Sequence, residues 1–248
     1  MTATAKAVPV DDALEWPQKD KRRFLHAAYR VSNLDRTIKF YTQCFGMQLL
    51  RKRDFPEEKY SNAVLGFGPE DSHFVVVLTH NHGGDKFDIG TGFGHFGIAT
   101  QDIYEMVEVI RARGGVITRE PGPIEGGQTA LGMKLLLKYD NPQEKFSMAM
   151  VGYGELSQTT IIELKYNYGV AEYTKGNGYV EVAISTEDVC KSAETVELVI
   201  EELGGKITQP PCSIPGINTK ITSFLDPDGW KTVLVDNEDF LKELQKKD

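Results

Sequence analysis

The sequence predicts an α+β fold built from two tandem copies of one module. The first observation is an internal repeat: residues 54–60 (DFPEEKY) return as residues 140–146 (DNPQEKF), and positions 54 and 140 differ by 86. The second is that strand-like and helix-like periodicities recur in the same order in both copies. The third is size, because 248 residues, 40% of them hydrophobic, are enough to form a buried core.

The first copy begins with a strand and a helix. Residues 24–31 are apolar and strand-like, and apolar side chains at helical spacing then predict a helix that ends at Gly46. A second helix is expected to begin near Asp102 and to end at Gly114. The further strands predicted for this copy are residues 61–66, 74–79 and 94–99.

The second copy ends with a feature that the first copy lacks. Its helix, which carries Val189, Val196 and Ile200, is followed by residues 220–236, which predict a hairpin with a DPDG turn. In the first copy, residues 128–129, the match to 218–219, run directly into residues 130–133, the match to 44–47. Each copy shows what the other has lost. The first copy lacks about 17 residues that would match 220–236, and the second lacks about 20 that would match 24–43.

This reading divides the chain into four parts. We expect an N-terminal extension at 1–23, a first module truncated at its end at 24–129, a second module truncated at its start at 130–238, and a C-terminal helical tail at 239–248. The lost hairpin, strand and helix would leave sheet edges unpaired, which predicts low stability or self-association through those edges.

Composition excludes several classes of partner. A net charge of −8 argues against nucleic acid and anionic membranes as the main partner. No run approaches the roughly 18 apolar residues of a membrane span, and the N-terminus lacks the apolar core of a secretory signal, so a cytoplasmic location is expected. Three cysteines without a CxxC pair predict reduced thiols.

Polar residues on predicted strands are the candidate functional groups. Residues i and i+4 of a strand share one face, which places His26 with Arg30 and Glu163 with Asn167, while His95 lies in an apolar stretch. Such groups are costly inside a protein unless they are hydrogen-bonded or bind a metal. From spacing alone, a satisfied core histidine and a solvent-facing glutamate are the favoured readings, and a metal site is the weaker alternative.

Several motifs resemble those of glyoxalase I, in its two-domain plant form, a member of the vicinal oxygen chelate superfamily. The resemblance covers residues 14–245 and implies tandem βαβββ glyoxalase/dioxygenase-type modules that form barrel-like sheets. The motifs that carry it are FLHAAYRV (24–31), LDRTIKFY (34–41), GFGH (92–95), REPGP (119–123), IELKYNYG (162–169) and LDPDGWK (225–231).

The resemblance implies four metal ligands per site, two from each of two paired units. One site would hold His95 and Glu163, and its other two ligands would fall in the missing block. A second site would hold His26 and Glu181, the residue at the His95 position of the second copy. The remaining positions of this second site are Val77 and Val233, where glutamates are expected.

The implied reaction is that of lactoylglutathione lyase. The hemithioacetal of methylglyoxal and glutathione is isomerised to S-lactoylglutathione, and a divalent ion, Zn²⁺ or Ni²⁺, acts as the Lewis acid. The family's base is the tail glutamate, so the catalytic base here is unknown: this position is missing in one site and is Val233 in the other. The positions that match the family's glutathione contacts are Arg30, Asn81 and Asn167.

Two other functions remain open at this point. The chain could be a non-catalytic binder of glutathione conjugates, or a partner subunit that pairs with an intact relative able to supply the missing ligands. A ring-cleaving dioxygenase, which uses two histidines and one carboxylate, is less favoured because the second copy contains no histidine.

Overall fold

The computed structural model describes residues 10–84, 86–98, 100, 102–115, 133–200, 204–214 and 218–246. The predicted join at 129–130 lies outside these residues. The helices are α1 (Val10–Lys19), α2 (Leu34–Phe45), α3 (Ile103–Ala112), α4 (Val189–Ile200) and α5 (Asn237–Gln245). The strands are β1 (Phe24–Arg30), β2 (Gln48–Phe55), β3 (Tyr60–Gly66), β4 (Val75–Asn81), β5 (Lys134–Asn141), β6 (Phe146–Gly152), β7 (Ile161–Asn167), β8 (Tyr179–Thr186), β9 (Lys206–Ser213), β10 (Lys220–Leu225) and β11 (Lys231–Asp236).

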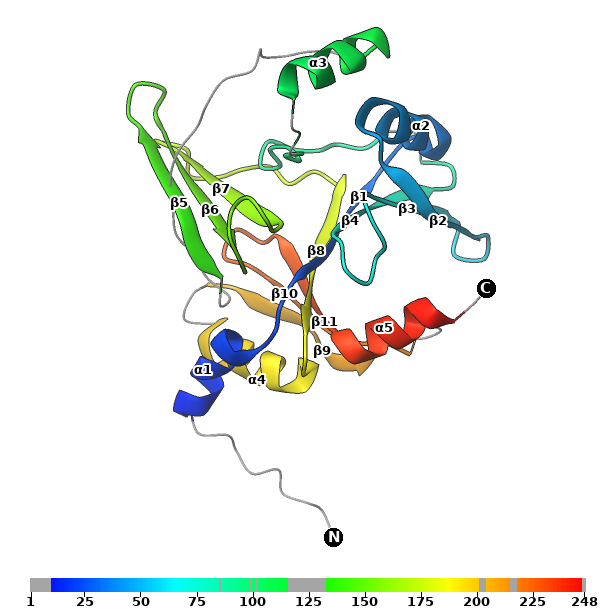
Figure 1. Ribbon diagram of the computed structural model, residues 1–248. Helices are drawn as coiled ribbons and strands as arrows, with labels where there is room; N and C mark the ends of the chain where they lie inside the picture. The colour runs from blue at the N-terminus through cyan, green and yellow to red at the C-terminus, as the bar shows by residue number, and fades with distance from the viewer. Residues whose placement is uncertain are drawn as a thin grey trace.

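Eight of these strands form one sheet, in the order β2-β3-β4-β1-β8-β11-β10-β9 (Figure 1). The sheet has two halves of the same construction, β1-α2-β2-β3-β4 and β8-α4-β9-β10-β11. In each half the first strand pairs parallel with the last, and β1 joins the halves by pairing antiparallel with β8. The halves come from opposite ends of the chain, so the two modules share one sheet.

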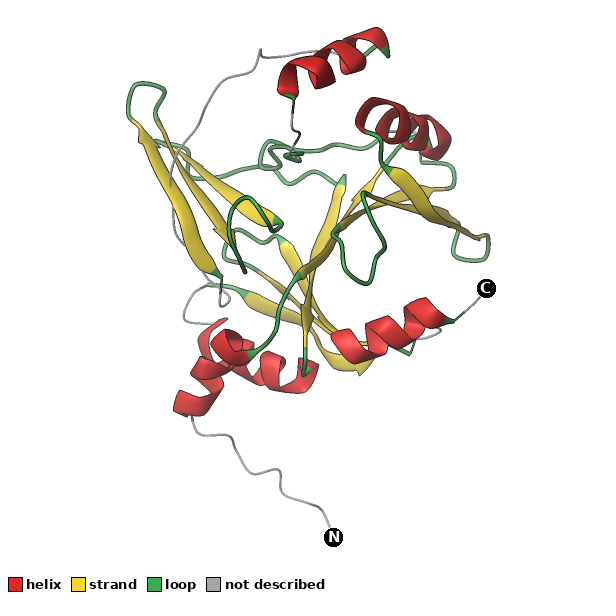
Figure 2. Ribbon diagram, viewed as in Figure 1, coloured by secondary structure: helices red, strands yellow, loops and turns green. Residues whose placement is uncertain are grey.

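The strands β5, β6 and β7 form a second, separate antiparallel sheet. The α+β class is therefore confirmed, with helices at the periphery of the strands (Figure 2). The expected barrel-like closure is not found among the described residues, since each sheet has a linear order and two edge strands.

The helix α2 covers one face of the first half. Its residues Ile38, Tyr41 and Phe45 pack on a core that includes the fully buried Leu65 and Leu78. Asn33 caps the start of this helix by accepting from the Arg36 backbone N–H, and the helix ends at Gly46 with φ of 70°. The predicted strand, helix and glycine stop are confirmed here.

The N-terminal segment is attached to α4 by a buried polar cluster. Arg22 Nε donates to Asp20 Oδ2 at 2.8 Å, and both side chains are at most 1% exposed. Asp20 also accepts from the Glu187 backbone N–H at 2.8 Å, and Ser192 Oγ accepts from Arg22 at 3.0 Å and from Trp16 Nε1 at 2.8 Å. Because both charges are paired, they can be held out of water.

In the first copy one predicted strand is not found among the described residues, and one observed strand was not predicted. The described residues 94–98 belong to no strand, although a strand was predicted at 94–99. In the eight-stranded sheet the first strand of each half, β1 or β8, is hydrogen-bonded to a strand on both sides. In the described part of the chain, residues 94–98 have no strand on either side to bond with. The strand β2 was not predicted, because the consecutive charged residues Arg51, Lys52 and Arg53 interrupt the alternation of apolar and polar side chains that is typical of a strand.

Candidate active site

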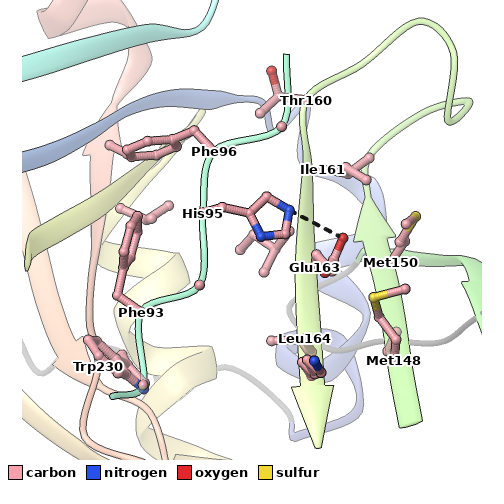
Figure 3. A pocket seen from close by; sticks show the side chains of 18 of the residues that line it. Phe93, His95, Phe96, Met148, Met150, Thr160, Ile161, Glu163, Leu164 and Trp230 are labelled. Carbon is pink, nitrogen blue, oxygen red and sulfur yellow. Dashed lines mark ion pairs between the residues drawn. The ribbon is translucent and has the colours of Figure 1, made fainter. Parts of the chain in front are cut away.

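The side chains of His95 and Glu163 meet in a wide cleft between β7 and the segment before α3. His95 Nε2 lies 3.9 Å from Glu163 Oε2, and Figure 3 shows the two side chains pointing toward each other. Glu163 is 26% exposed and His95 64%. The cleft, of about 2250 Å³, is lined also by Met148, Met150 and Trp230, so a polar pair faces a largely apolar enclosure.

The second predicted pair is also brought together. His26 Nε2 on β1 lies 3.8 Å from Glu181 Oε1 on β8, and both side chains are about one-fifth exposed. A third group, not predicted from the sequence, completes this cluster: Lys231 Nζ on β11 donates to Glu181 Oε2 at 2.7 Å. Burial alone would raise the pKa of Glu181, but its interactions with His26 and Lys231 outweigh burial and lower that pKa to about 2.

The cation beside Glu181 is therefore the Lys231 ammonium. Val77 and Val233, the other two positions of this predicted site, are apolar, and Val233 is 3% exposed. The register explains why these positions belong together: the residue two positions after His26 pairs with Val77, and the residue two positions after Glu181 pairs with Val233. The same parallel register of β8 and β11 is the signal that could have revealed Lys231.

We expect Glu181→Gln to destabilise the protein in a pH-dependent way. The pKa of about 2 lies below the ordinary 4.5, so ionised Glu181 contributes stability above about pH 4.5, and this contribution is lost as the pH falls toward 2. At pH 7 the loss in the free energy of unfolding is up to about 3 kcal/mol. Urea unfolding at pH 7 and pH 3 measures it, with the exposed Glu155→Gln as the control. A difference between wild type and Glu181→Gln that is the same at both pH values would contradict the interpretation.

The predicted substrate contacts are distributed over two places. Asn167 lies in the cleft on the same face of β7 as Glu163, and its Nδ2 donates to the Tyr173 hydroxyl at 3.0 Å. Arg30, on the face of β1 that carries His26, donates to the Asn177 carbonyl at 2.8 Å. Asn81 is exposed at the end of β4. Asn167 alone of these three lines the cleft.

The His95–Glu163 pair fits a divalent metal ion in donor type. Bonds of about 2.0–2.2 Å at the tetrahedral angle place an imidazole nitrogen and a carboxylate oxygen about 3.4 Å apart on one ion, so the two side chains, now 3.9 Å apart, would move slightly closer to hold it together. No cluster of three or more His, Cys, Asp or Glu side chains able to hold a metal occurs within residues 10–84, 86–98, 100, 102–115, 133–200, 204–214 and 218–246. The residues that the structure describes thus offer two ligands at this place.

Comparison with known proteins shows which family the chain belongs to. The Glyoxalase/Bleomycin resistance protein/Dioxygenase superfamily matches residues 23–130. Lactoylglutathione lyase of Oryza sativa subsp. japonica is 57% identical over 277 residues, which cover 94% of this chain and 95% of that protein. The chain belongs to the glyoxalase I family.

Other glyoxalase I relatives extend the match to the fold. The crystal structure of glyoxalase I from Zea mays is 54% identical, with a TM-score of 0.88, and covers 93% of this chain and 98% of that one. A probable lactoylglutathione lyase of Arabidopsis thaliana, named chloroplastic, is 51% identical over 285 residues, covering 97% of this chain and 80% of that protein. In the described part of the chain, no helix is long and apolar enough to cross a membrane.

Proposed function

We propose that the chain acts as a lactoylglutathione lyase at the His95–Glu163 pair. The observation that carries the proposal is the 3.9 Å approach of these two side chains in the cleft of a glyoxalase I family member. The substrate is the hemithioacetal of glutathione and methylglyoxal, and the metal is Zn²⁺ or Ni²⁺, both of which accept nitrogen and oxygen ligands.

The residues of the cleft have separate roles in this proposal. His95 and Glu163 would hold the metal, which when bound stabilises negative charge on the substrate oxygens as a Lewis acid. Asn167 offers its amide to the glutathione part of the substrate, and Met148, Met150 and Trp230 line the same cleft and reduce the access of water. Arg30 and Asn81, outside this cleft, are proposed to meet glutathione only at the His26 side of the molecule.

Two observations support the predicted loss of a block of residues where the two copies join. The alignment with the rice relative spans 277 positions whereas the chain has 248 residues, so at least 29 of those positions (277 less 248) have no residue here. The strand β7 is an edge strand, whereas the last strands β4 and β11 of the two complete halves each have a first strand beside them.

The test is turnover by the purified full chain, freed of metal with a chelator and then supplied with Zn²⁺ or Ni²⁺. We expect metal-dependent formation of S-lactoylglutathione at more than about 1 s⁻¹. The alternative function, a non-catalytic binder of glutathione conjugates, is favoured by the presence of only two of four ligands per chain in the described residues. Saturable binding of an S-alkylglutathione without turnover would establish this alternative in place of the lyase.

We also propose the cytosol as the compartment. The free state of Cys44, Cys190 and Cys212 supports a reducing environment. Because one relative is named chloroplastic, the location is tested by imaging the tagged full-length chain.

A further inference from the structure

One hydrogen bond holds the side chain of Asn167 in the cleft. Its Nδ2 donates to the Tyr173 hydroxyl at 3.0 Å, and the Asn167 backbone N–H donates to the same oxygen at 3.3 Å. Both side chains are partly buried and line the cleft. Because one N–H of the amide is bound in this way, its carbonyl oxygen and its second N–H remain available to a ligand in a defined direction.

Tyr173 also lies against the segment that leads to His95. A Cβ atom added at Gly92 would come within 3.1 Å of Tyr173 Cβ and 2.5 Å of Trp230 Cζ2, so the close packing here requires glycine. The carbonyl of Thr174, the next residue, accepts from the Gly92 backbone N–H at 3.2 Å. Tyr173 therefore contacts both sides of the cleft, the strand β7 and the segment before α3.

The first copy of the repeat has a similar arrangement without the hydroxyl. Through the offset of 86, Tyr173 corresponds to Phe87 and Asn167 to Asn81. The Phe87 ring and the Asn81 side chain lie at the same turn, 3.5 Å and 3.6 Å from the place of a Cβ atom at Gly84. Within the described residues the side chain of Asn81 makes no hydrogen bond. The aromatic ring is thus common to both copies, and the hydroxyl is specific to the cleft.

We propose that Tyr173 is a positioning residue, whose hydroxyl orients the Asn167 amide for the glutathione part of the substrate. The inference rests on the proposed function, in which Asn167 contacts glutathione. Asn167 lies four residues after Glu163 on β7, about 13 Å along the strand. At this distance the amide acts on the peptide arm of the substrate and not on the carbons that exchange a proton. The Tyr173 hydroxyl therefore affects binding and leaves the chemical step unchanged.

The substitution Tyr173→Phe removes the hydroxyl and keeps the ring beside Gly92. The Asn167 amide is then free to rotate, and part of the binding free energy is used to orient it. We expect the Kd for S-hexylglutathione, a probe that cannot be isomerised, and the KM for the hemithioacetal each to rise about 5-fold. The turnover number kcat should stay within about twofold of wild type.

Calorimetric titration of the full chain with S-hexylglutathione, in the presence of Zn²⁺ or Ni²⁺, measures Kd, and initial rates separate KM from kcat. Tyr168→Phe is the matched control. It removes a hydroxyl that is bonded to Ser147 Oγ at 2.8 Å, and Tyr168 is not among the residues that line the cleft. We expect this control to keep the wild-type Kd and KM. Both variants should melt at the temperature of the wild type, which shows that the fold is unchanged.

A double-mutant cycle tests the route through Asn167. Asn167→Ala removes the amide, so we expect Tyr173→Phe to have no further effect on Kd in that background. Additive losses would overturn the inference, because Tyr173 would then act on the ligand or on the fold and not through Asn167. A wild-type Kd and KM for Tyr173→Phe alone would overturn it as well.

The outcomes for Tyr173 and for the lyase activity are distinct. If the chain binds S-hexylglutathione without turnover, and Tyr173→Phe weakens this binding through Asn167, the positioning role stands and the lyase activity fails. If the chain turns over the hemithioacetal and Tyr173→Phe leaves KM unchanged, the activity stands and the positioning role fails. A chain that binds no S-hexylglutathione would also contradict the positioning role.

Discussion

Glu163→Gln is expected to lower kcat/KM for the hemithioacetal by at least about 100-fold, about 2.7 kcal/mol of transition-state stabilisation. The amide keeps the shape of the side chain but loses the negative charge and most of the affinity for a divalent ion. Glu163 lies within the cleft, 3.9 Å from His95, and its side chain is only 26% exposed.

Initial rates at saturating metal measure this effect. The matched control is Glu155→Gln, which removes an exposed carboxylate from the turn between β6 and β7, outside the cleft lining, and should retain wild-type kcat/KM. Retention of more than a third of the activity by Glu163→Gln would show that the chemistry occurs elsewhere.

Asp20→Ala is expected to lower the free energy of unfolding by about 3–5 kcal/mol, because it leaves the Arg22 guanidinium buried without its carboxylate. Arg22 is 1% exposed at its side chain and cannot recover water without moving the segment that precedes β1. The loss should shift the melting temperature by about 10 °C in a chain of this size.

Calorimetry or urea unfolding measures the loss. Glu15→Ala is the matched control, because it breaks an ion pair with Lys19 in which both side chains are 63% exposed, and such pairs contribute less than about 1 kcal/mol. A loss below about 1 kcal/mol for Asp20→Ala would mean that the remaining contacts of Arg22, such as its hydrogen bond to Ser192, are enough to hold its charge out of water.

Much of the fold follows from local signals. The helix at residues 34–45, the stop at Gly46 and the hairpin at the end of the second copy were all predicted, since periodicity and turn residues fix them locally. The strand β2 and the helix α1 were not, because β2 carries a run of charges at an edge and α1 contains Pro17. Residues 94–98 have a strand-like sequence, but within the described part of the chain no strand lies beside them to pair with, and no local signal can reveal this.

The candidate site was predictable only through the repeat and the family resemblance. These placed His95 with Glu163 and His26 with Glu181, and the structure brings each pair within 4 Å. Lys231 was missed, because its approach to Glu181 depends on the parallel register of two strands that lie 50 residues apart in sequence. Pairing across such a separation is a property of the assembled sheet.

The antiparallel pairing of β1 with β8 also has a consequence for synthesis on the ribosome. Phe24 and Ile184 are neighbours in the sheet although 160 positions separate them in the chain. At about 5–20 residues per second, β1 waits roughly 8–30 s for its partner to be made. During that interval the nascent first half presents an open strand edge, so the period of greatest exposure to aggregation and to chaperones falls in the middle of translation.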